Sequence, residues 1–529
     1  MFPLASVFNK ITAKMADAFE FCSFSGKNHW HYYAKMVRNI SQKKVAHPMQ
    51  TKTMERQPVQ DVPQSGDCPE ENVEVRHADT ILVDPSDSKA VRQTIFRLAG
   101  PSLVEMLLIN LTQMLNMIMV GRVGAEAVAI VGLSTQPFLL FVALFMALNV
   151  GTTVIVARSI GAGDVAQANK AAGQSFALNI VLAVIVVAFS YFFAGELLML
   201  MGASKQVAAE GLLYAKIVFL SIGFTTISMS LTAILRGAGD TRTPMKINVV
   251  SNVLIVLLGF PMIYGFAGFP KFGVTGAAIS TIIAQAVSMI WVVTVMFSGK
   301  YKLRITISEM LHFDKEVVKR ILTIGFPSAL EQVVMRLGML TFVKIAASLG
   351  TISLAATQIA FNIMGLTFMP GMAFSIAAST LVGQALGAEK PDLAERYGWQ
   401  VRKFGMIVAG VMGIGFIGLA PYIMMMYTTD QEVIAKGAVG LQIMGFIQVS
   451  QATQFILGGA LRGAGDTRYP LYSTCIGVWG FRIALSVLMV YVFNWDITGI
   501  WLAAAADQFV RSILIYRRYK RGNWKTVRV

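Results

Sequence analysis

The octapeptide LRGAGDTR stands at residues 235–242 and again at residues 461–468, and a proline follows each copy at the same distance. The same offset of 226 residues relates the motif PSxxE at residues 101–105 to a second copy at residues 327–331, and it relates three pairs of glycines. A single offset that relates several pairs of motifs, spread over most of both halves, indicates an internal duplication. The chain therefore consists of one unit of roughly 200 residues used twice.

The composition predicts that both copies lie in a membrane. Hydrophobic residues make up 55% of the chain and charged residues 14%, with a mean hydropathy of +0.61; an average soluble domain is about 25% charged. The formal charge of +16 lies in loops between apolar runs, so it indicates membrane topology and not a nucleic-acid partner. The three cysteines and five histidines form no ligand spacing, and neither a metal site nor another cofactor is expected.

Twelve apolar segments follow a polar tail. Each is long enough for the roughly 20 helical residues that cross a ~30 Å hydrocarbon core. The predicted organisation is a disordered, polar N-terminal tail at 1–92, six helices at 93–298, a linker at 299–316, six helices at 317–516 and a basic tail at 517–529. Because six is even, both halves enter the membrane in the same orientation. This predicts parallel repeats with a path between two lobes.

The loops after the even-numbered segments carry most of the Lys and Arg residues, as does the end of the chain. By the positive-inside rule, the linker and both termini are cytoplasmic. The octapeptides then lie on the cytoplasmic side. The expected location is the plasma membrane, as a multi-pass protein.

At this point the chain resembles a known family. Two six-span halves, LRGAGDTRxP in both, Met119-Val120-Gly121 and the stretches at 368–371 and 380–388 resemble the multidrug and toxic compound extrusion family of cation-coupled antiporters. The resemblance covers about residues 95–515. It implies a V-shaped pair of six-helix lobes, alternating access, and export of organic cations or other amphiphiles against an inward flow of H⁺ or Na⁺, by a protein expected to be monomeric.

Two carboxylates stand at equivalent places in the two halves, Glu105 and Glu331, each four residues after a proline. Placing a charged side chain at the depth of the bilayer costs about 2.5–3.5 kcal/mol, so each glutamate requires a function or a stabilising contact that offsets this cost. If each helix starts close to its proline, the carboxylate lies within about two turns of a helix N-terminus. Two interpretations stay open: an ion-coupling group with a raised pKa, and a structural group stabilised by the helix dipole.

The family resemblance also bears on the coupling residue. Where many relatives place an aspartate before Gly121, this chain has Asn116, which cannot titrate but could ligate Na⁺. Some relatives carry a glutamate where this chain has Met335, with the acid one turn earlier at Glu331. These departures favour Glu331, in the C-terminal lobe, as the main coupling site.

Polar side chains in apolar segments are candidates for the substrate cavity. Three glutamines in one segment recur at a spacing of three, which places them on one side of a helix. A row of polar side chains on one side of a membrane helix either lines a water-filled cavity or forms hydrogen bonds to another helix, and we favour the cavity. The candidate residues are Gln332, Arg336, Gln448, Gln451, Gln454, Asn149, Gln358 and Asn362.

The octapeptides are predicted to be hinges or gates. Their glycines allow a sharp turn after a helix, and their charged residues can cap and bridge that turn. The residues are Arg236, Gly237, Gly239, Asp240 and Arg242 in the first copy, and Arg462, Gly463, Gly465, Asp466 and Arg468 in the second. The chain has no GxxxxGK[ST] loop and no nucleophile–base arrangement, so a secondary transporter is favoured over an enzyme. A flippase of lipid-linked saccharides is the first alternative, and a membrane-embedded enzyme or a channel is the second.

Overall fold

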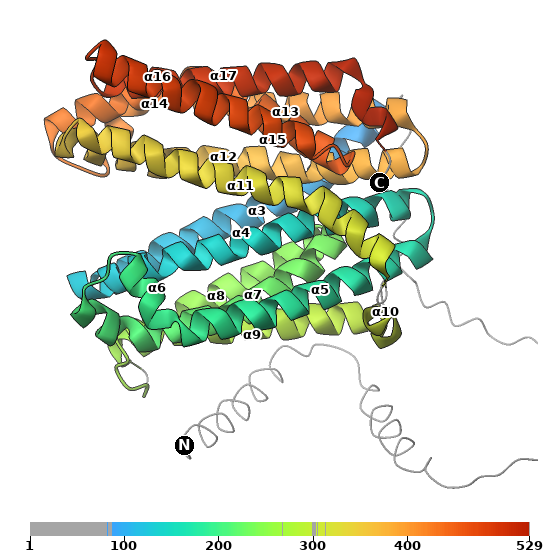
Figure 1. The fold of residues 1–529 in the computed structure, drawn as a ribbon, viewed down its shortest axis with the longest axis horizontal. Helices are drawn as coiled ribbons and strands as arrows, with labels where there is room; N and C mark the ends of the chain where they lie inside the picture. The colour runs from blue at the N-terminus through green and yellow to red at the C-terminus, as the bar shows by residue number, and fades with distance from the viewer. Residues whose placement is uncertain are drawn as a thin grey trace, which may run out of the picture. The chain divides into compact units, whose positions relative to one another are not determined.

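The computed structural model describes residues 82, 87–266, 268–298, 303, 305–312 and 314–527. The predicted N-terminal tail lies almost wholly outside the described residues. The described chain is helical throughout its regular elements (Figure 1). The elements of the N-terminal repeat are α3 (Ser88–Gly121), α4 (Ala125–Gly161), α5 (Val165–Phe192), α6 (Ala194–Leu200), α7 (Lys205–Gly237), α8 (Arg242–Tyr264) and α9 (Val274–Phe297).

The C-terminal repeat follows the short helix α10 (Ile307–Leu311). Its fifth span contains π-helical turns and is divided into four pieces. The elements are α11 (Lys315–Ser348), α12 (Thr351–Gly387), α13 (Pro391–Met425), α14 (Gln431–Gly463), α15 (Arg468–Cys475), η1 (Ile476–Ile483), α16 (Ala484–Val487), η2 (Leu488–Val492), α17 (Ile497–Arg521) and η3 (Asn523–Thr526).

The helix boundaries repeat as the sequence predicts. The helices α4 and α12, and likewise α7 and α14, begin and end at residues 226 positions apart. Within the described residues, ten helical stretches are long and apolar enough to cross a membrane. The helices α11 and α17 occupy the two other predicted spans, and both carry buried charged residues. The fold is therefore an all-α membrane architecture of two repeated six-helix units.

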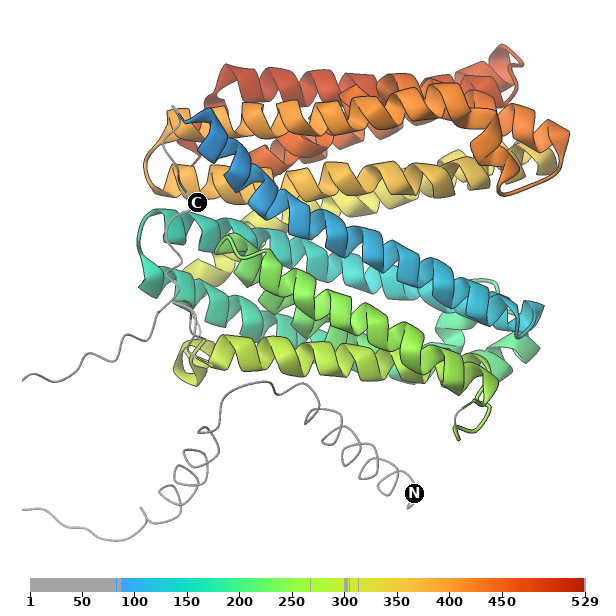
Figure 2. The ribbon, with the colours of Figure 1, turned by 180° about the vertical axis from the view of Figure 1, so that it is seen from behind.

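The first helix of each repeat begins inside the other repeat. Residues of α3 from Val91 to Ala99 are buried in the same apolar core as Leu381 and Leu457 of the C-terminal repeat. Reciprocally, Ile321 of α11 is buried against Ile155 of α4. Figure 2 shows α3, in blue, passing from beside the C-terminal repeat to the N-terminal repeat. The repeats are thus interlocked.

Two predicted boundaries differ from the structure. The helices do not start at their prolines: α3 and α11 begin well before Pro101 and Pro327, which lie inside them. Membrane helices tolerate proline because neighbouring helices satisfy the freed backbone groups. At the other end, α17 continues to Arg521, and Trp524 folds back to stack on Tyr519 with ring centroids 4.6 Å apart. The predicted basic tail is therefore in part a packed helix end.

Candidate functional site: the octapeptide contacts between the repeats

Glu105 is held by two helices of its own repeat. Its Oε1 accepts hydrogen bonds from Nη2 of Arg236, at 2.5 Å, and from Nδ2 of Asn248, at 2.6 Å. The carboxylate is 3% exposed. A charge buried to this degree is stable only when it is paired and hydrogen-bonded. The contact ties α3 to the end of α7 and to the beginning of α8.

Glu331 repeats this arrangement in the C-terminal half. The Nη2 of Arg462 donates to Oε1 at 2.8 Å and to Oε2 at 3.0 Å, and Oγ1 of Thr474 donates to Oε1 at 3.3 Å. Glu331 is also buried. Its three helices are α11, α14 and α15, the counterparts of those that meet at Glu105.

The sequence identified the two carboxylates and the two octapeptides separately, and the structure brings them together. Both glutamates lie roughly 25 Å into their helices, at 1.5 Å per residue, so the dipole of the helix N-terminus does not stabilise them, contrary to that interpretation. The octapeptide arginine does so instead.

Each octapeptide is also held by the opposite repeat. The Nη2 of Arg158, in α4, donates to the carbonyl oxygen of Ala464 at 3.0 Å. At the position related by the repeat, Nε2 of Gln384, in α12, donates to the carbonyl oxygen of Gly237 at 3.1 Å. The hydroxyl of Thr380 adds a bond to the carbonyl of Arg236 at 3.0 Å. One segment in each half therefore contacts both its own carboxylate and the partner repeat.

Glycines make this contact close. A Cβ atom added to Gly161 of α4 would collide with the carbonyl oxygen of Gln384, and one added to Gly387 of α12 would collide with that of Arg158. The two contacts are related by the repeat, so α4 and α12 meet about a local twofold relation. Nothing larger than glycine fits at either place without moving the helices apart.

The turns after the octapeptide helices follow the sequence prediction in part. Gly239 and Gly465 have φ of 92° and 85°, where glycine is favoured. Asp240 caps the next helix, since its Oδ1 accepts from the backbone N–H of Arg242 at 2.9 Å. Asp466 instead pairs with Nε of Arg518, in α17, at 2.8 Å. The second turn is thus linked to the last helix of its own repeat.

A further charged cluster lies inside the C-terminal repeat. Asp507 of α17 is fully buried and pairs with Arg482 at 2.5 Å and with Arg511 at 2.7 Å. Sequence reasoning missed the part played by Arg511. The signal was available, because Asp507 and Arg511 stand four residues apart in a predicted span, a spacing that brings side chains together on a helix.

The candidate cavity residues are divided between buried and exposed positions. Gln448 is buried and its amide donates to Oγ1 of Thr367 at 3.3 Å. Gln451, Gln454 and Asn149 are also buried, Gln332 is half-buried, and Arg336, Gln358 and Asn362 are exposed; Asn116, which was predicted as an ion-coupling residue, is half-buried. The amide atoms of Gln451 and Asn149 have no hydrogen-bond partner within the described part of the chain. That these residues line a substrate path stays a prediction.

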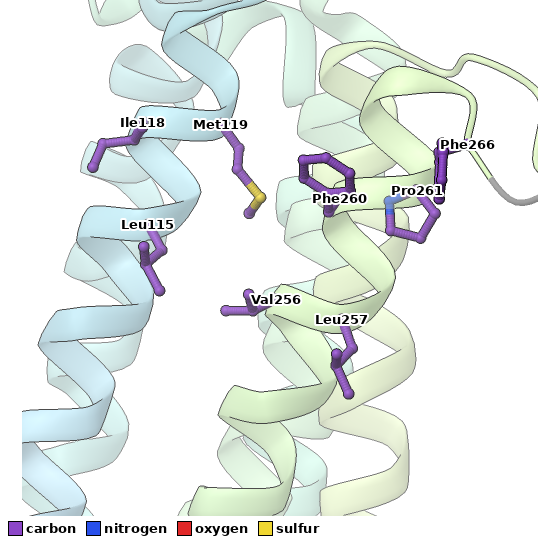
Figure 3. A pocket seen from close by; sticks show the side chains of 8 residues that line it. All are labelled: Leu115, Ile118, Met119, Val256, Leu257, Phe260, Pro261 and Phe266. Carbon is purple, nitrogen blue, oxygen red and sulfur yellow. The ribbon is translucent and has the colours of Figure 1, made fainter.

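An apolar groove of about 550 Å³ lies between α3 and α8 (Figure 3). In the figure, Met119 and Val256 project into the space between the two helices. No charged residue lines it, so it suits the apolar part of a ligand. Its lining residues are Leu115, Ile118, Met119, Val256, Leu257, Phe260, Pro261 and Phe266.

Comparison with known proteins agrees with this architecture. The MatE family model matches residues 101–261 and 327–488, one match in each repeat. The chain is 31% identical over 440 residues to a probable multidrug resistance protein NorM of Thermotoga maritima, covering 82% of this chain and 93% of that protein.

Two solved structures have the same fold. One is a MOP superfamily transporter from Pyrococcus furiosus, with a TM-score of 0.79, 22% identity, and coverage of 86% of this chain and 99% of that one. The other is a multidrug resistance MATE family transporter in an outward-facing conformation, with a TM-score of 0.78, 23% identity, and coverage of 84% and 97%. The duplicated motif, the repeated helices and the two family matches agree. This chain belongs to the multidrug and toxic compound extrusion (MatE) family of membrane transporters.

Proposed function

We propose that the chain is a secondary active exporter of small amphiphilic or cationic molecules, driven by inward flow of H⁺ or Na⁺ through alternating access. The name of the NorM relative, a probable multidrug resistance protein, supports export of small molecules. The observation that carries the proposal is the double role of the octapeptides. Each holds a buried carboxylate of its own repeat through an arginine side chain, and each bonds to the opposite repeat through a backbone carbonyl.

This arrangement supports coupling between ion binding and the gate. When a proton or Na⁺ neutralises Glu331, its attraction for Arg462 is lost. The arginine is two residues from Ala464, whose carbonyl is bonded by Arg158 of the other repeat. Loss of the ion pair therefore loosens the segment that closes the gate. A bound ion can shift the equilibrium between the closed and the open gate only if it binds the two states with different affinities. The ion does so here because the carboxylate of Glu331 is free of Arg462 only in the open state.

Glu331 is proposed as the main coupling site and Glu105 as a second one, with Asn116 as a Na⁺ ligand. Glu331 receives bonds on both carboxylate oxygens from Arg462. Release of the Glu331 carboxylate therefore depends closely on the position of the Arg462 side chain.

The apolar groove between α3 and α8 supports binding of amphiphiles. Its thioether and aromatic side chains adapt to ligands of different shapes, and rings attract cations. The exposed polar residues of α11 and α12, including Arg336 and Gln358, are proposed to line the path between the repeats. The protein is proposed to act as a monomer in the plasma membrane, with the octapeptides and both termini in the cytoplasm.

Transport by purified protein in liposomes tests the proposal. Efflux of a fluorescent organic cation is measured with an imposed H⁺ gradient, an imposed Na⁺ gradient, or neither, for the wild type and for Glu331→Gln. We expect at least a tenfold loss of gradient-driven efflux in the variant, and a flat pH profile. Gln431→Ala, a neutral change at an exposed position at the start of α14 and outside the proposed path, is the matched control for expression and insertion. Wild-type efflux by Glu331→Gln at every pH would exclude this residue as the coupling site.

A further inference from the structure

A second groove, of about 410 Å³, lies at the octapeptide end of the C-terminal repeat. It runs between α13 and α17, with buried Thr453 of α14 also lining it. Figures 1 and 2 show α17 on the side of the C-terminal repeat away from the N-terminal repeat. The helix α13 also contacts the beginning of α3, where the ring centroids of Phe96 and Phe404 are 5.4 Å apart. The groove is thus separate from the gate and from the path proposed between the repeats, and it is placed to meet surrounding lipid.

The central side chain of the groove is fixed in place. The guanidinium of Arg402 lies over the rings of Trp399 and Tyr516, 5.5 and 5.2 Å from their centroids. Its Nε donates to Oγ1 of Thr453 at 3.1 Å. These contacts leave its two terminal nitrogens without a recorded partner among the described residues. A planar guanidinium held in this way presents a donor fork that matches phosphate oxygens.

Two further cations line the groove, Arg517 and Lys520. Both are exposed, and neither has a recorded ion pair or hydrogen bond within the residues that the structure describes. Nearby acidic side chains are already paired with other cations. Glu395 lies 2.7 Å from Nζ of Lys525, which also reaches Asp392 at 3.1 Å, and Asp466 pairs with Arg518. Three positive charges therefore face one groove without an anion.

The depth of the groove agrees with a lipid headgroup. The helix α13 has 35 residues, about 52 Å at 1.5 Å per residue, and so exceeds the ~30 Å hydrocarbon core by about 20 Å. Arg402 stands roughly 16 Å from its first residue. If the excess is shared between the two ends, Arg402 lies just inside the hydrocarbon boundary, from which a long side chain reaches outward to the phosphates. Trp and Tyr are enriched at this level.

We propose that this groove binds the phosphate of an anionic membrane phospholipid, with Arg402 as the oriented donor and Arg517 and Lys520 as flanking charges. Basic grooves between helices on the cytoplasmic side suit such headgroups. The acyl chains then lie along α13 and α17, where Ile513 and Tyr516 continue the lining. Lipid is favoured over free inorganic phosphate because the groove opens on the outer side of the repeat.

Native mass spectrometry of the full-length protein in mild detergent tests the proposal. The wild type is titrated with phosphatidylglycerol, with phosphatidylcholine, and with inorganic phosphate. We expect saturable retention of phosphatidylglycerol at one site and no comparable retention of the other two. In the double variant Arg517→Gln/Lys520→Gln, we expect affinity for phosphatidylglycerol to fall roughly tenfold to thirtyfold, since each cation near the membrane surface contributes about 1 kcal/mol.

The matched control is Lys319→Gln/Arg320→Gln, which removes one Lys and one Arg from exposed positions of α11 outside the groove. It should keep wild-type affinity. Arg402→Lys preserves the charge but loses the planar fork, and it should also bind phosphatidylglycerol less tightly. Equal losses in the two double variants would mean general attraction to an anionic surface and would overturn the proposal. Binding of inorganic phosphate with the affinity of phosphatidylglycerol, or wild-type retention by Arg517→Gln/Lys520→Gln, would overturn it as well.

Discussion

The pairing of each octapeptide arginine with a buried glutamate predicts a measurable coupling energy. Removal of one partner from a buried ion pair costs about 3–5 kcal/mol, because the other charge stays buried without compensation. The side chain of Arg462 is 22% exposed and glutamine keeps an acceptor oxygen, so water and the new amide recover part of this cost. For Glu331→Gln we therefore expect a loss of about 1–3 kcal/mol in the free energy of unfolding.

The double-mutant cycle isolates the pair. Glu331→Gln, Arg462→Gln and the double variant are unfolded reversibly in mixed micelles with increasing dodecyl sulfate, and the coupling energy is obtained from the four stabilities. We expect about 1–3 kcal/mol for this pair. The i,i+4 pair of Lys436 and Glu432, at 3.5 Å, is the control, since Glu432 is 58% exposed and such pairs contribute about 0.3–0.5 kcal/mol. A coupling energy no larger than that of the control would refute the assignment of Glu331 to a buried ion pair.

Four further outcomes follow from the packing. Gly161→Leu should reduce transport at least tenfold at unchanged expression, since its side chain collides with the facing helix; transport in liposomes measures this. Asp507→Asn leaves two buried arginines facing a neutral amide and should destabilise the protein by about 3–5 kcal/mol, seen as a lower Tm. Trp524→Ala should remove about 3 kcal/mol, because the ring is fully buried; the same unfolding assay checks it. The Lys170 side chain, 2.5 Å from Asp314, lowers the pKa of that carboxyl below 3.8. The stabilisation is therefore present above pH 3.8 and lost as pH falls through the lowered pKa, so the Tm difference between wild type and Asp314→Asn should vanish in acid.

The repeated architecture could be predicted from the sequence because the duplication leaves the same markers at a fixed offset. The ends of α7 and α14, at Gly237 and Gly463, coincide with the octapeptides. Helix length and composition also decided the class, since apolar runs of this length need a membrane. These are local properties of the chain, and local properties can be read without a structure.

The pairing of the octapeptide arginines with the buried glutamates could not be predicted in the same way. Glu105 and Arg236 are 131 residues apart in sequence, and no spacing rule joins them. The assumption that a proline begins a helix misplaced both glutamates, because that rule comes from helices exposed to water, where a freed carbonyl is not satisfied by a neighbouring helix. The crossing of α3 and α11 into the opposite repeats depends on tertiary packing alone.

The duplication repeats the octapeptide contacts but not the interiors of the two halves. The positions that correspond to Arg482, Asp507 and Arg511 in the N-terminal repeat are Val256, Thr281 and Gln285, none of them charged. Val256 lines the apolar groove between α3 and α8. At the equivalent place, the C-terminal repeat has π-helical turns, a feature often found at functional sites, and Arg482 lies in them.

Because their interiors differ, the two repeats can meet two requirements that conflict within a single helical bundle. A groove that binds apolar ligands must be lined by few polar side chains, whereas a buried carboxylate needs cations and hydrogen-bond donors around it. The N-terminal repeat meets the first requirement beside α8, and the C-terminal repeat meets the second around Asp507. Each octapeptide accepts a hydrogen bond from the opposite repeat, so the contact across the interface is repeated while the two interiors differ. The contacts between the repeats are therefore nearly symmetric, whereas the N-terminal interior has an apolar groove and the C-terminal interior has a buried charged cluster.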